Sequence, residues 1–351
     1  MKFRLATGQD RADWEGFLSG FPHAEFSHSF RMKGVYEDVY AYRTAYWIGE
    51  EDNVIRGICP LVHVHSLLHM NKTILISLPM VTSAGLLTAD AAAKTAFLQH
   101  LKSVSADENA VVQLRGRAEN AIDNVASYDG YISFVLSLKK ETGDVYWNAL
   151  SSRNRGKIRK SRKAGTVVEF GGNGLLAEFY FLHVRRNKEL ATPVYPKAFF
   201  AAILEAFPEA EIALARNGDK PIAAMLNVGF NGVMNYLFGS SDSRFYYYYP
   251  NNHLFHEFIE RSRREGYERI DFGRTSVGVG TYQFKRQWGA DEVPLFYQYI
   301  GKGAEKFADF SIQGVQASLA FKIFSRVWSR YLPVWVTEKL GPGLIKRMPL
   351  A

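Results

Sequence analysis

The order of strands and turns expected from the sequence repeats along the chain, and this repetition restricts the fold more than any other feature. Alternating apolar runs split by a short polar turn predict two β-hairpins, around residues 42–65 and 211–230. Each is followed by another apolar strand and then by a segment of helical length. Strands and helices mixed in two similar halves predict an α/β (α+β) fold with two domains of one kind and mixed sheets. The expected strands are 42–48, 55–65, 74–78, 110–113, 131–138, 167–170, 211–216, 222–230 and 233–239, and the expected helices are 1–20, 88–104, 146–164, 174–190, 197–207 and 252–265.

Length and composition agree with two domains. A chain of 351 residues exceeds one typical hydrophobic core, and a hydrophobic content of 47% is typical of a globular protein. The expected boundaries are 1–140 and 141–300 for the two domains and 301–351 for a C-terminal helical tail.

The same composition excludes some classes of protein. Cys59 is the only cysteine, so internal disulfides and cysteine-rich zinc sites are excluded. His63 and His65 share a strand face without an evident third ligand, and we expect no metal. No apolar run reaches the roughly 18 residues of a membrane span, and the N-terminus has no apolar run of signal-peptide length. These features predict a cytoplasmic protein.

Residues 271–299 combine a glycine turn with a short aromatic and basic segment. Gly273, Gly278 and Gly280 predict turns after a buried strand end, because glycine accepts backbone angles that other residues resist. The segment that follows contains Tyr282, Phe284, Lys285 and Trp288. A cation among aromatic rings beside a turn suits an anionic or carbonyl group. A solvated lysine beside core aromatics is the alternative.

A dense basic run occupies residues 153–163, RNRGKIRKSRK, in a chain whose net charge is +8. On a helix, Arg155, Arg159 and Arg162 share one face at spacings i, i+4 and i+7. Like charges this close repel one another, so the run favours a bound anion such as phosphate, which the arginine fork suits. A solvated helix face is the alternative. Nucleic-acid binding is a third possibility, although aromatic residues for base stacking are missing from the run.

Three further residues are candidates for substrate binding. Tyr195 lies in a stiff proline-flanked segment, 192–196, and either lines a cleft or packs in the core. His253 stands at a helix start, where it either relays a proton or has a structural role. Arg274 either contacts substrate or pairs with Asp271 to fix the glycine turn.

Five segments together resemble a known family. They are SRNRGKIRKSRKAG (152–165), ATPVYPKAFF (191–200), KPIAAML (220–226), YPNNHLFHEFIE (249–260) and DFGRTS…GTYQFKRQWGA (271–290). Their order resembles that of the FemAB-like acyltransferases and, more closely, of the FemAB-related proteins associated with exopolysaccharide and PEP-CTERM (exosortase) systems. The resemblance covers about 150–300 well and the N-terminal half more loosely, through FSHSF (26–30) and its hairpin. It implies two tandem GNAT-type acyltransferase domains.

The resemblance also implies an activity. An acyl- or aminoacyltransferase of this kind moves an activated acyl group to an amine or hydroxyl of a cell-envelope saccharide or precursor, related to exopolysaccharide or peptidoglycan. Phe284 and Lys285 match a family pair near the reacting acyl group, so Lys285 would stabilise the oxyanion and Phe284 would pack against the donor. The arginine helix would hold acceptor or donor phosphates, with Arg155, Arg159 and Arg162 as the leading candidates. With the residues weighed above, the full set of candidates for substrate binding is Arg155, Arg159, Arg162, Tyr195, His253, Arg274 and Tyr282.

The donor is expected to be a co-substrate, with no tightly bound cofactor. Acyl-CoA and aminoacyl-tRNA are the two candidates. The helix opening YPNNHL lacks the glycine nest with which GNAT enzymes hold pyrophosphate, which favours the aminoacyl donor. The expected acceptor is a phosphorylated or lipid-linked saccharide. A noncatalytic duplicated GNAT-fold protein that binds polysaccharide or a biosynthetic partner is the alternative.

The last fifty residues differ in character. Val315, Leu319, Ile323, Val327 and Trp328 fall near one helical side, and a basic stripe follows. The stripe consists of Lys322, Arg326 and Arg330. Such a helix either lies on an anionic membrane, here the cytoplasmic face of the inner membrane, or packs on the second domain.

Overall fold

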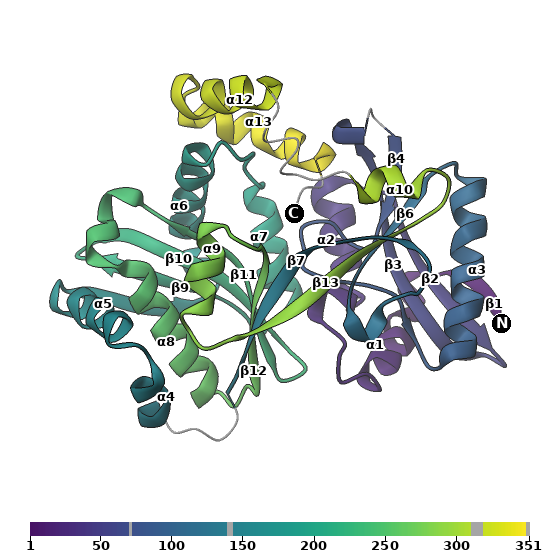
Figure 1. The fold of residues 1–351 in the computed structure, drawn as a ribbon, viewed down its shortest axis with the longest axis horizontal. Coiled ribbons are helices and arrows are strands. Elements are labelled where there is room, and N and C mark those ends of the chain that lie inside the picture. The colour runs from purple at the N-terminus through teal and green to yellow at the C-terminus, as the bar shows by residue number, and fades with distance from the viewer. Residues whose placement is uncertain (70–71, 139–142, 310–318, 349–351) are drawn as a thin grey trace. The chain divides into compact units, whose positions relative to one another are not determined.

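The chain folds into two compact units, each assembled from segments far apart in the sequence. The computed structural model describes residues 1–69, 72–138, 143–309 and 319–348 (Figure 1). Unit 1 comprises Met1–Ile132, Pro294–Ser318 and Gly343–Ala351, and unit 2 comprises Ser133–Val293 and Leu319–Pro342. Two strands, β7 (Ala126–Ser137) and β13 (Asp291–Ile300), contribute residues to both units.

Unit 1 contains a mixed sheet in the order β1-β2-β3-β4-β6-β13, with β5 paired to β3. Neighbouring strands are antiparallel except β4 and β6, which are parallel and are joined through helix α3. The elements of this unit besides the two shared strands are β1 (Lys2–Leu5), α1 (Arg11–Ser19), α2 (Arg31–Tyr40), β2 (Thr44–Glu51), β3 (Val54–Ser66), β4 (Lys72–Ile76), β5 (Leu87–Thr88), α3 (Ala91–Asp107), β6 (Val111–Arg117) and α10 (Ala304–Ala308). Its core is formed where Phe97 and Leu101 of α3 pack against buried strand residues such as Leu75 and Val112.

Unit 2 follows a similar plan in the order β7-β12-β11-β10-β9-β8. Its antiparallel strands run from β8 to β11, and β11 pairs with β12 in parallel through helix α8. Its elements are α4 (Gly143–Ala149), α5 (Ser152–Lys163), β8 (Thr166–Gly171), α6 (Leu176–Glu189), α7 (Lys197–Ala206), β9 (Ala210–Asn217), β10 (Lys220–Phe230), β11 (Val233–Ser241), α8 (Pro250–Arg264), β12 (Arg269–Ser276) and α9 (Gly280–Arg286). Helices α6 and α7 pack on one face of the sheet and α8 on the other, with α5 against α8 (Figure 1). Strand β10 is almost entirely buried because both faces are covered.

The predicted fold class is therefore confirmed: each unit has antiparallel strands followed by one parallel step across a helix. Two local predictions were wrong. The helix expected over 1–20 begins only at Arg11, since Lys2–Leu5 pairs with β2. The helix expected over 146–164 is divided, because the Ser151 side chain accepts a hydrogen bond from Asn154 N (3.2 Å) and caps α5.

The C-terminal helical segment belongs to unit 2 from Leu319 to Pro342 and to unit 1 from Gly343. It consists of α12 (Leu319–Arg326), a π-helical turn (Val327–Tyr331) and α13 (Val334–Arg347). Trp328 is buried, and Lys188 Nζ donates to Ser329 O at 2.7 Å. A Cβ on Gly341 would lie 2.6 Å from Val194 N, so the close approach of α13 requires glycine there. Val315, expected on the same helical side as Trp328, lies outside the described residues.

Candidate active site

The candidate site lies in unit 2, where strands β11 and β12 separate. Their parallel pairing covers Val233–Asn235 and Arg269–Asp271, although both strands continue beyond it. Strand β11 instead stays with β10 up to Ser241, through an irregularity of register between Leu226 and Asn227. An extra residue in one strand bends it and increases its twist. The facing edges of β11 and β12 are thereby left without each other as partners.

Lys285 on α9 reaches the edge of β12 just beyond this point. Its Nζ donates to Gly273 O at 2.7 Å and to Arg274 O at 3.0 Å. The same atom lies 5.9 Å from the centre of the Tyr236 ring on β11. Lys285 therefore stands between the two separating strands, and only 6% of the residue is exposed.

Burial changes the chemistry of this amine. It lowers the pKa of Lys285 to about 7, an effect that the nearby Asp271 carboxylate opposes and the Arg274 guanidinium increases. A protonated lysine has three N–H donors, and the two carbonyls take two of them. One N–H therefore remains for a ligand oxygen at the opening between β11 and β12.

Aromatic side chains surround the lysine and limit access of water. The ring of Phe255, on α8, lies 4.8 Å from that of Phe284, 5.2 Å from that of Tyr236 and 5.8 Å from that of Trp288. Phe284 is half-buried, whereas Trp288 is buried. An apolar wall lowers the local dielectric, so a hydrogen bond from Lys285 to a developing negative charge gains strength there.

The glycine turn that holds the lysine's acceptors has the predicted character. Gly273 and Gly278 have φ angles of +70° and +85°, in the region that favours glycine, whereas Gly280 opens helix α9. The Asp271 carboxylate accepts from Gly273 N at 2.7 Å and also from the hydroxyl of Ser133. These bonds hold the peptide that precedes the Gly273 carbonyl, one of the two acceptors of Lys285 Nζ.

Tyr282 and Arg274 lie in the same segment of the chain but have different contacts. The Tyr282 hydroxyl donates to Glu292 Oε1 at 2.6 Å, and its ring packs 5.3 Å from that of Phe134 on β7. Arg274 offers its carbonyl to Lys285, and its charge contributes to the low pKa of the lysine. Arg274 is therefore next to the Lys285 amine, whereas Tyr282 supports the turn through β7 and β13.

The arginines of α5 share a face as predicted, and that face packs on Trp147. The guanidinium groups of Arg159 and Arg162 lie 5.6 and 5.9 Å from the Trp147 ring, and Arg155 donates to the carbonyl of Asn148 at 3.0 Å. Arg162 also donates to Glu257 Oε1 at 2.8 Å. The three side chains are thus engaged within unit 2 while remaining at its surface.

Two lysines of the same helix instead lie beside the start of α8. The Nζ atoms of Lys157 and Lys160 are 5.8 and 5.2 Å from the ring centre of Tyr249, the residue before Pro250. Burial, and after it the charge of Arg153, lowers the pKa of Lys157. Positive side chains next to a helix N-terminus form a surface suited to an anion.

His253 and Tyr195 have mainly internal partners. His253 is buried in the first turn of α8, with Nε2 3.3 Å from Glu257 Oε1 and 3.4 Å from Arg162 Nε. Tyr195 belongs to an aromatic cluster on the α6–α7 face of the sheet, with its ring 5.0 Å from that of Phe238. The structure brings Phe284, Lys285 and Arg274 together and places Tyr195 in a different cluster.

Sequence reasoning missed Tyr236 and Trp147. Tyr236 contacts the site only because β11 is the neighbour of β12, and no motif marks it. Burial raises the pKa of its hydroxyl to about 12, so it is a proton donor and not a base at neutral pH. Trp147 lies shortly before the basic run of residues 153–163. This closeness in sequence is the feature from which its contact with the arginines could have been predicted.

Comparison with known proteins agrees with this geometry. Residues 151–286 match the profile of the acetyltransferase (GNAT) domain family, and this segment contains Lys285 and the separating strands. No curated protein matches the sequence. The described part of the chain contains no group of three or more His, Cys, Asp or Glu side chains that could hold a metal ion.

Three solved structures share the fold over most of their length. A structure described as FemX has a TM-score of 0.64 at 17% identity and covers 85% of this chain and 97% of its own. The C-terminal domain of a putative lysylphosphatidylglycerol synthetase from Agrobacterium fabrum has a TM-score of 0.59 at 10% identity. The match covers 86% of this chain and 95% of that domain. A tandem GNAT protein from the clavulanic acid biosynthesis pathway has a TM-score of 0.52 at 8% identity. The match covers 86% of this chain and 99% of that protein. The chain therefore has a tandem GNAT acyltransferase fold.

Proposed function

We propose that this protein is an acyl- or aminoacyltransferase that modifies an amine or hydroxyl of a cell-envelope saccharide or precursor. The observation that carries the proposal is Lys285, a buried amine with one N–H left over where β11 and β12 separate. A donor of this kind suits the oxyanion of acyl transfer. The acceptor belongs to the exopolysaccharide, PEP-CTERM or peptidoglycan class that the sequence resemblance implies.

The proposed reaction proceeds through one tetrahedral intermediate. The acceptor nitrogen or oxygen bonds to the acyl carbon while the carbonyl electron pair moves to the oxygen. The ammonium of Lys285 donates to this oxyanion, and Phe284 packs against the acyl chain. The intermediate then expels the thiol or hydroxyl of the donor, and the proton lost by the acceptor is taken up by this leaving group or by water.

The start of α8 supports an aminoacyl-tRNA donor over acyl-CoA. Pro250 has no N–H, and the N–H groups of Asn252 and His253 already point to Tyr249 O at 3.1 and 3.4 Å. A helix that begins in this way offers few free amides to a pyrophosphate. The neighbouring cations, Lys157 and Lys160, suit phosphates of tRNA or of a phosphorylated or lipid-linked acceptor.

Stability measured against candidate donors tests this function. Purified protein is heated with a panel of acyl-CoAs, aminoacyl-tRNAs and nucleotide sugars. A ligand at a hundredfold excess over its Kd stabilises the folded state by about 2.7 kcal/mol, so the true donor class should raise the midpoint. Deacylated tRNA and free CoA are the matched controls.

The same panel distinguishes an enzyme from a binding protein. Stabilisation by one donor class, followed by transfer of its labelled acyl group to an amine or hydroxyl acceptor, is the expected result. Stabilisation by saccharides alone, with no response to any donor, would contradict the transferase and favour a noncatalytic GNAT-fold protein.

The outer side of the C-terminal segment supports peripheral membrane contact. Leu319, Ile323 and Tyr331 are 74%, 57% and 73% exposed, and Trp335 is 68% exposed. Together with the exposed Val327, Leu319, Ile323 and Tyr331 recur every fourth residue along α12 and the π-helical turn, which puts neighbours in this series near one side. Trp335 lies in the next helix, α13, beyond Leu332. The exposed cations Lys322, Arg326 and Arg330 follow the same spacing. The segment thus packs on unit 2 through Trp328 and presents an apolar and basic side suited to an anionic bilayer.

Vesicle flotation tests this contact. The protein should float with vesicles that contain phosphatidylglycerol and remain below with phosphatidylcholine alone. Changing Lys322, Arg326 and Arg330 to Gln should weaken binding roughly a hundredfold, since each basic residue contributes about 1 kcal/mol near an anionic surface. The charge-matched control changes Lys2, Arg11 and Lys220, which are exposed elsewhere. Equal flotation of the two variants would refute a role for the segment.

No helix in the described ranges is long and apolar enough to cross a membrane, so the expected contact is peripheral.

A further inference from the structure

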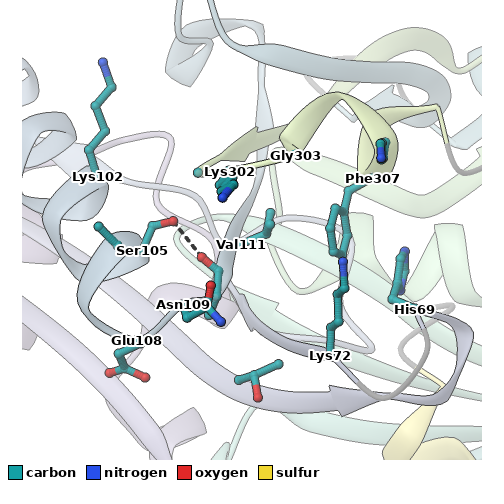
Figure 2. Close-up of a pocket in the computed structure, with 15 residues that line it drawn as sticks. His69, Lys72, Lys102, Ser105, Glu108, Asn109, Val111, Lys302, Gly303 and Phe307 are labelled. Carbon is teal, nitrogen blue, oxygen red and sulfur yellow. Dashed lines mark hydrogen bonds between the residues drawn. The ribbon is translucent and has the colours of Figure 1, made fainter.

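Unit 1 contains a pocket of about 1020 Å³ that the proposed transfer reaction does not use. It is bounded by the start of β4, the C-terminal end of α3, the start of β6 and the segment from the end of β13 into α10 (Figure 2). Pockets that bind small molecules have volumes of roughly 300–1,000 Å³. This pocket is therefore large enough for a complete small ligand.

Four lysines line this pocket. They are Lys72, Lys102, Lys302 and Lys306. All four are exposed, and among the described residues none of their ammonium groups has a hydrogen bond or an ion pair. Because they come from β4, α3 and the segment after β13, their convergence results from the fold and not from one basic run.

The single acid in the lining does not neutralise these lysines. Glu108 lies 3.3 Å from Arg43 NH2 through Oε1 and 3.2 Å from His63 Nδ1 through Oε2. Its two oxygens are thus engaged by Arg43 and His63, which lie outside the lysine group. A second, adjoining pocket shares Thr73 and Glu108 and adds further cationic side chains, so the positive potential extends beyond the first pocket.

The backbone holds one of the lysines at the rim. Lys302 stands between Gly301 and Gly303, whose φ angles are +120° and +79°. A Cβ on Gly301 would lie 2.0 Å from Ser105 Oγ, which itself donates to Ala110 O at 2.6 Å (Figure 2). The turn that carries Lys302 therefore sits tightly on the end of α3, which restricts where this lysine can point.

Aromatic and apolar side chains form another part of the pocket lining. The ring of His69 stacks on that of Phe307 with centroids 4.6 Å apart and planes at 13°, and Lys72 extends from β4 toward Phe307 (Figure 2). Burial, with a smaller effect of Lys72, lowers the pKa of His69 to about 4, so this ring is neutral at physiological pH. Val111 and Ala106 continue the wall. The pocket thus joins unpaired cations to an uncharged, ring-lined side.

We propose that this pocket binds a small molecule that carries a pyrophosphate, or two phosphate groups, beside a planar or apolar moiety. Phosphate charges match the lysines, and the remaining part of the molecule matches the wall of His69, Phe307 and Val111. Four lysines gathered around one pocket favour a small ligand over a nucleic acid, whose phosphates require an extended stripe of cations. This site belongs to unit 1 and does not depend on Lys285 or on the proposed transfer.

Calorimetric titration of the full chain with inorganic pyrophosphate and with ADP tests the site. We expect saturable binding of both, with ADP tighter because its ring can reach the apolar wall. The variant K72Q/K302Q should bind about tenfold or more weakly, since a hydrogen bond to a charged group contributes at least that much. The control variant K2Q/K220Q has the same net charge and changes exposed lysines elsewhere, and its affinity should match the parent.

Two results would overturn the proposal. One is the absence of saturable pyrophosphate binding in the parent protein. The other is equal affinity of K72Q/K302Q and K2Q/K220Q, which would place any bound anion outside this pocket, for example on α5. The changed lysines are exposed, so near-identical circular dichroism of the variants is expected and excludes unfolding as the cause.

Discussion

Replacing Lys285 with methionine should lower turnover by about 10²–10³-fold, the effect of removing one oxyanion donor in other enzymes. Methionine keeps the length of the side chain but has no N–H to donate to the acyl oxygen. The measurement is the steady-state rate of acyl transfer with the donor class that stabilises the folded protein. Lys220→Met is the matched control, because Lys220 is exposed at the start of β10.

The pH profile tests the same role independently. If the ammonium form of Lys285 stabilises the oxyanion, turnover should fall as the pH rises through about 7, where burial places the pKa of this amine. Unchanged turnover in Lys285→Met would remove the lysine from the reaction. A rate that rises through the same pH would instead assign the neutral amine as a proton acceptor.

Lys285→Met should also change how the stability of the folded protein depends on pH. The pKa of Lys285 is about 7 in the fold and 10.5 in the unfolded chain, so between these values the unfolded chain binds more protons. The parent's free energy of unfolding therefore rises with pH across this window, and the variant lacks this contribution. The free energy of unfolding of the variant minus that of the parent should therefore fall by about 3 kcal/mol between pH 7 and pH 10.

Urea unfolding of both proteins at several pH values measures this difference. Other titrating groups are common to both chains and cancel in the comparison. Loss of the hydrogen bonds to the carbonyls of Gly273 and Arg274 changes the free energy of unfolding of the variant by the same amount at every pH. It therefore does not alter the pH dependence of the difference. A difference that stays constant from pH 7 to pH 10 would mean that the Lys285 charge is not desolvated in the fold.

Much of the fold could be predicted because its signals are local. The hairpins β2–β3 and β9–β10 follow from apolar alternation around short polar turns, and α9 follows from the glycine turn and the aromatic segment. Strand β1 could not be predicted in this way, because four residues give little periodicity and only pairing with β2 makes Lys2–Leu5 a strand. Helix α2 (Arg31–Tyr40) was missed as well.

The candidate site was predictable where its parts are close in sequence. Lys285 and the carbonyls that hold it lie within one segment, so the sequence pattern identified them together. Tyr236 joins them only through the order of strands in the sheet. The four lysines of the unit 1 pocket are single residues in ordinary surroundings, and no run of charge marks them. Their convergence depends on three segments meeting in space.

The division of the chain between the units has a consequence for synthesis on the ribosome. Residues Leu295–Ile300 of β13 pair with Val112–Arg117 of β6, both within unit 1. The nascent chain must therefore complete all of Ser133–Val293 before the last strand of the unit 1 sheet emerges. At about 5–20 residues per second this takes roughly 10 to 30 seconds, during which the edge of β6 has no β13 to cover it. A free strand edge invites pairing with other chains, so translation speed and chaperone access over this interval should influence the yield of correctly folded protein.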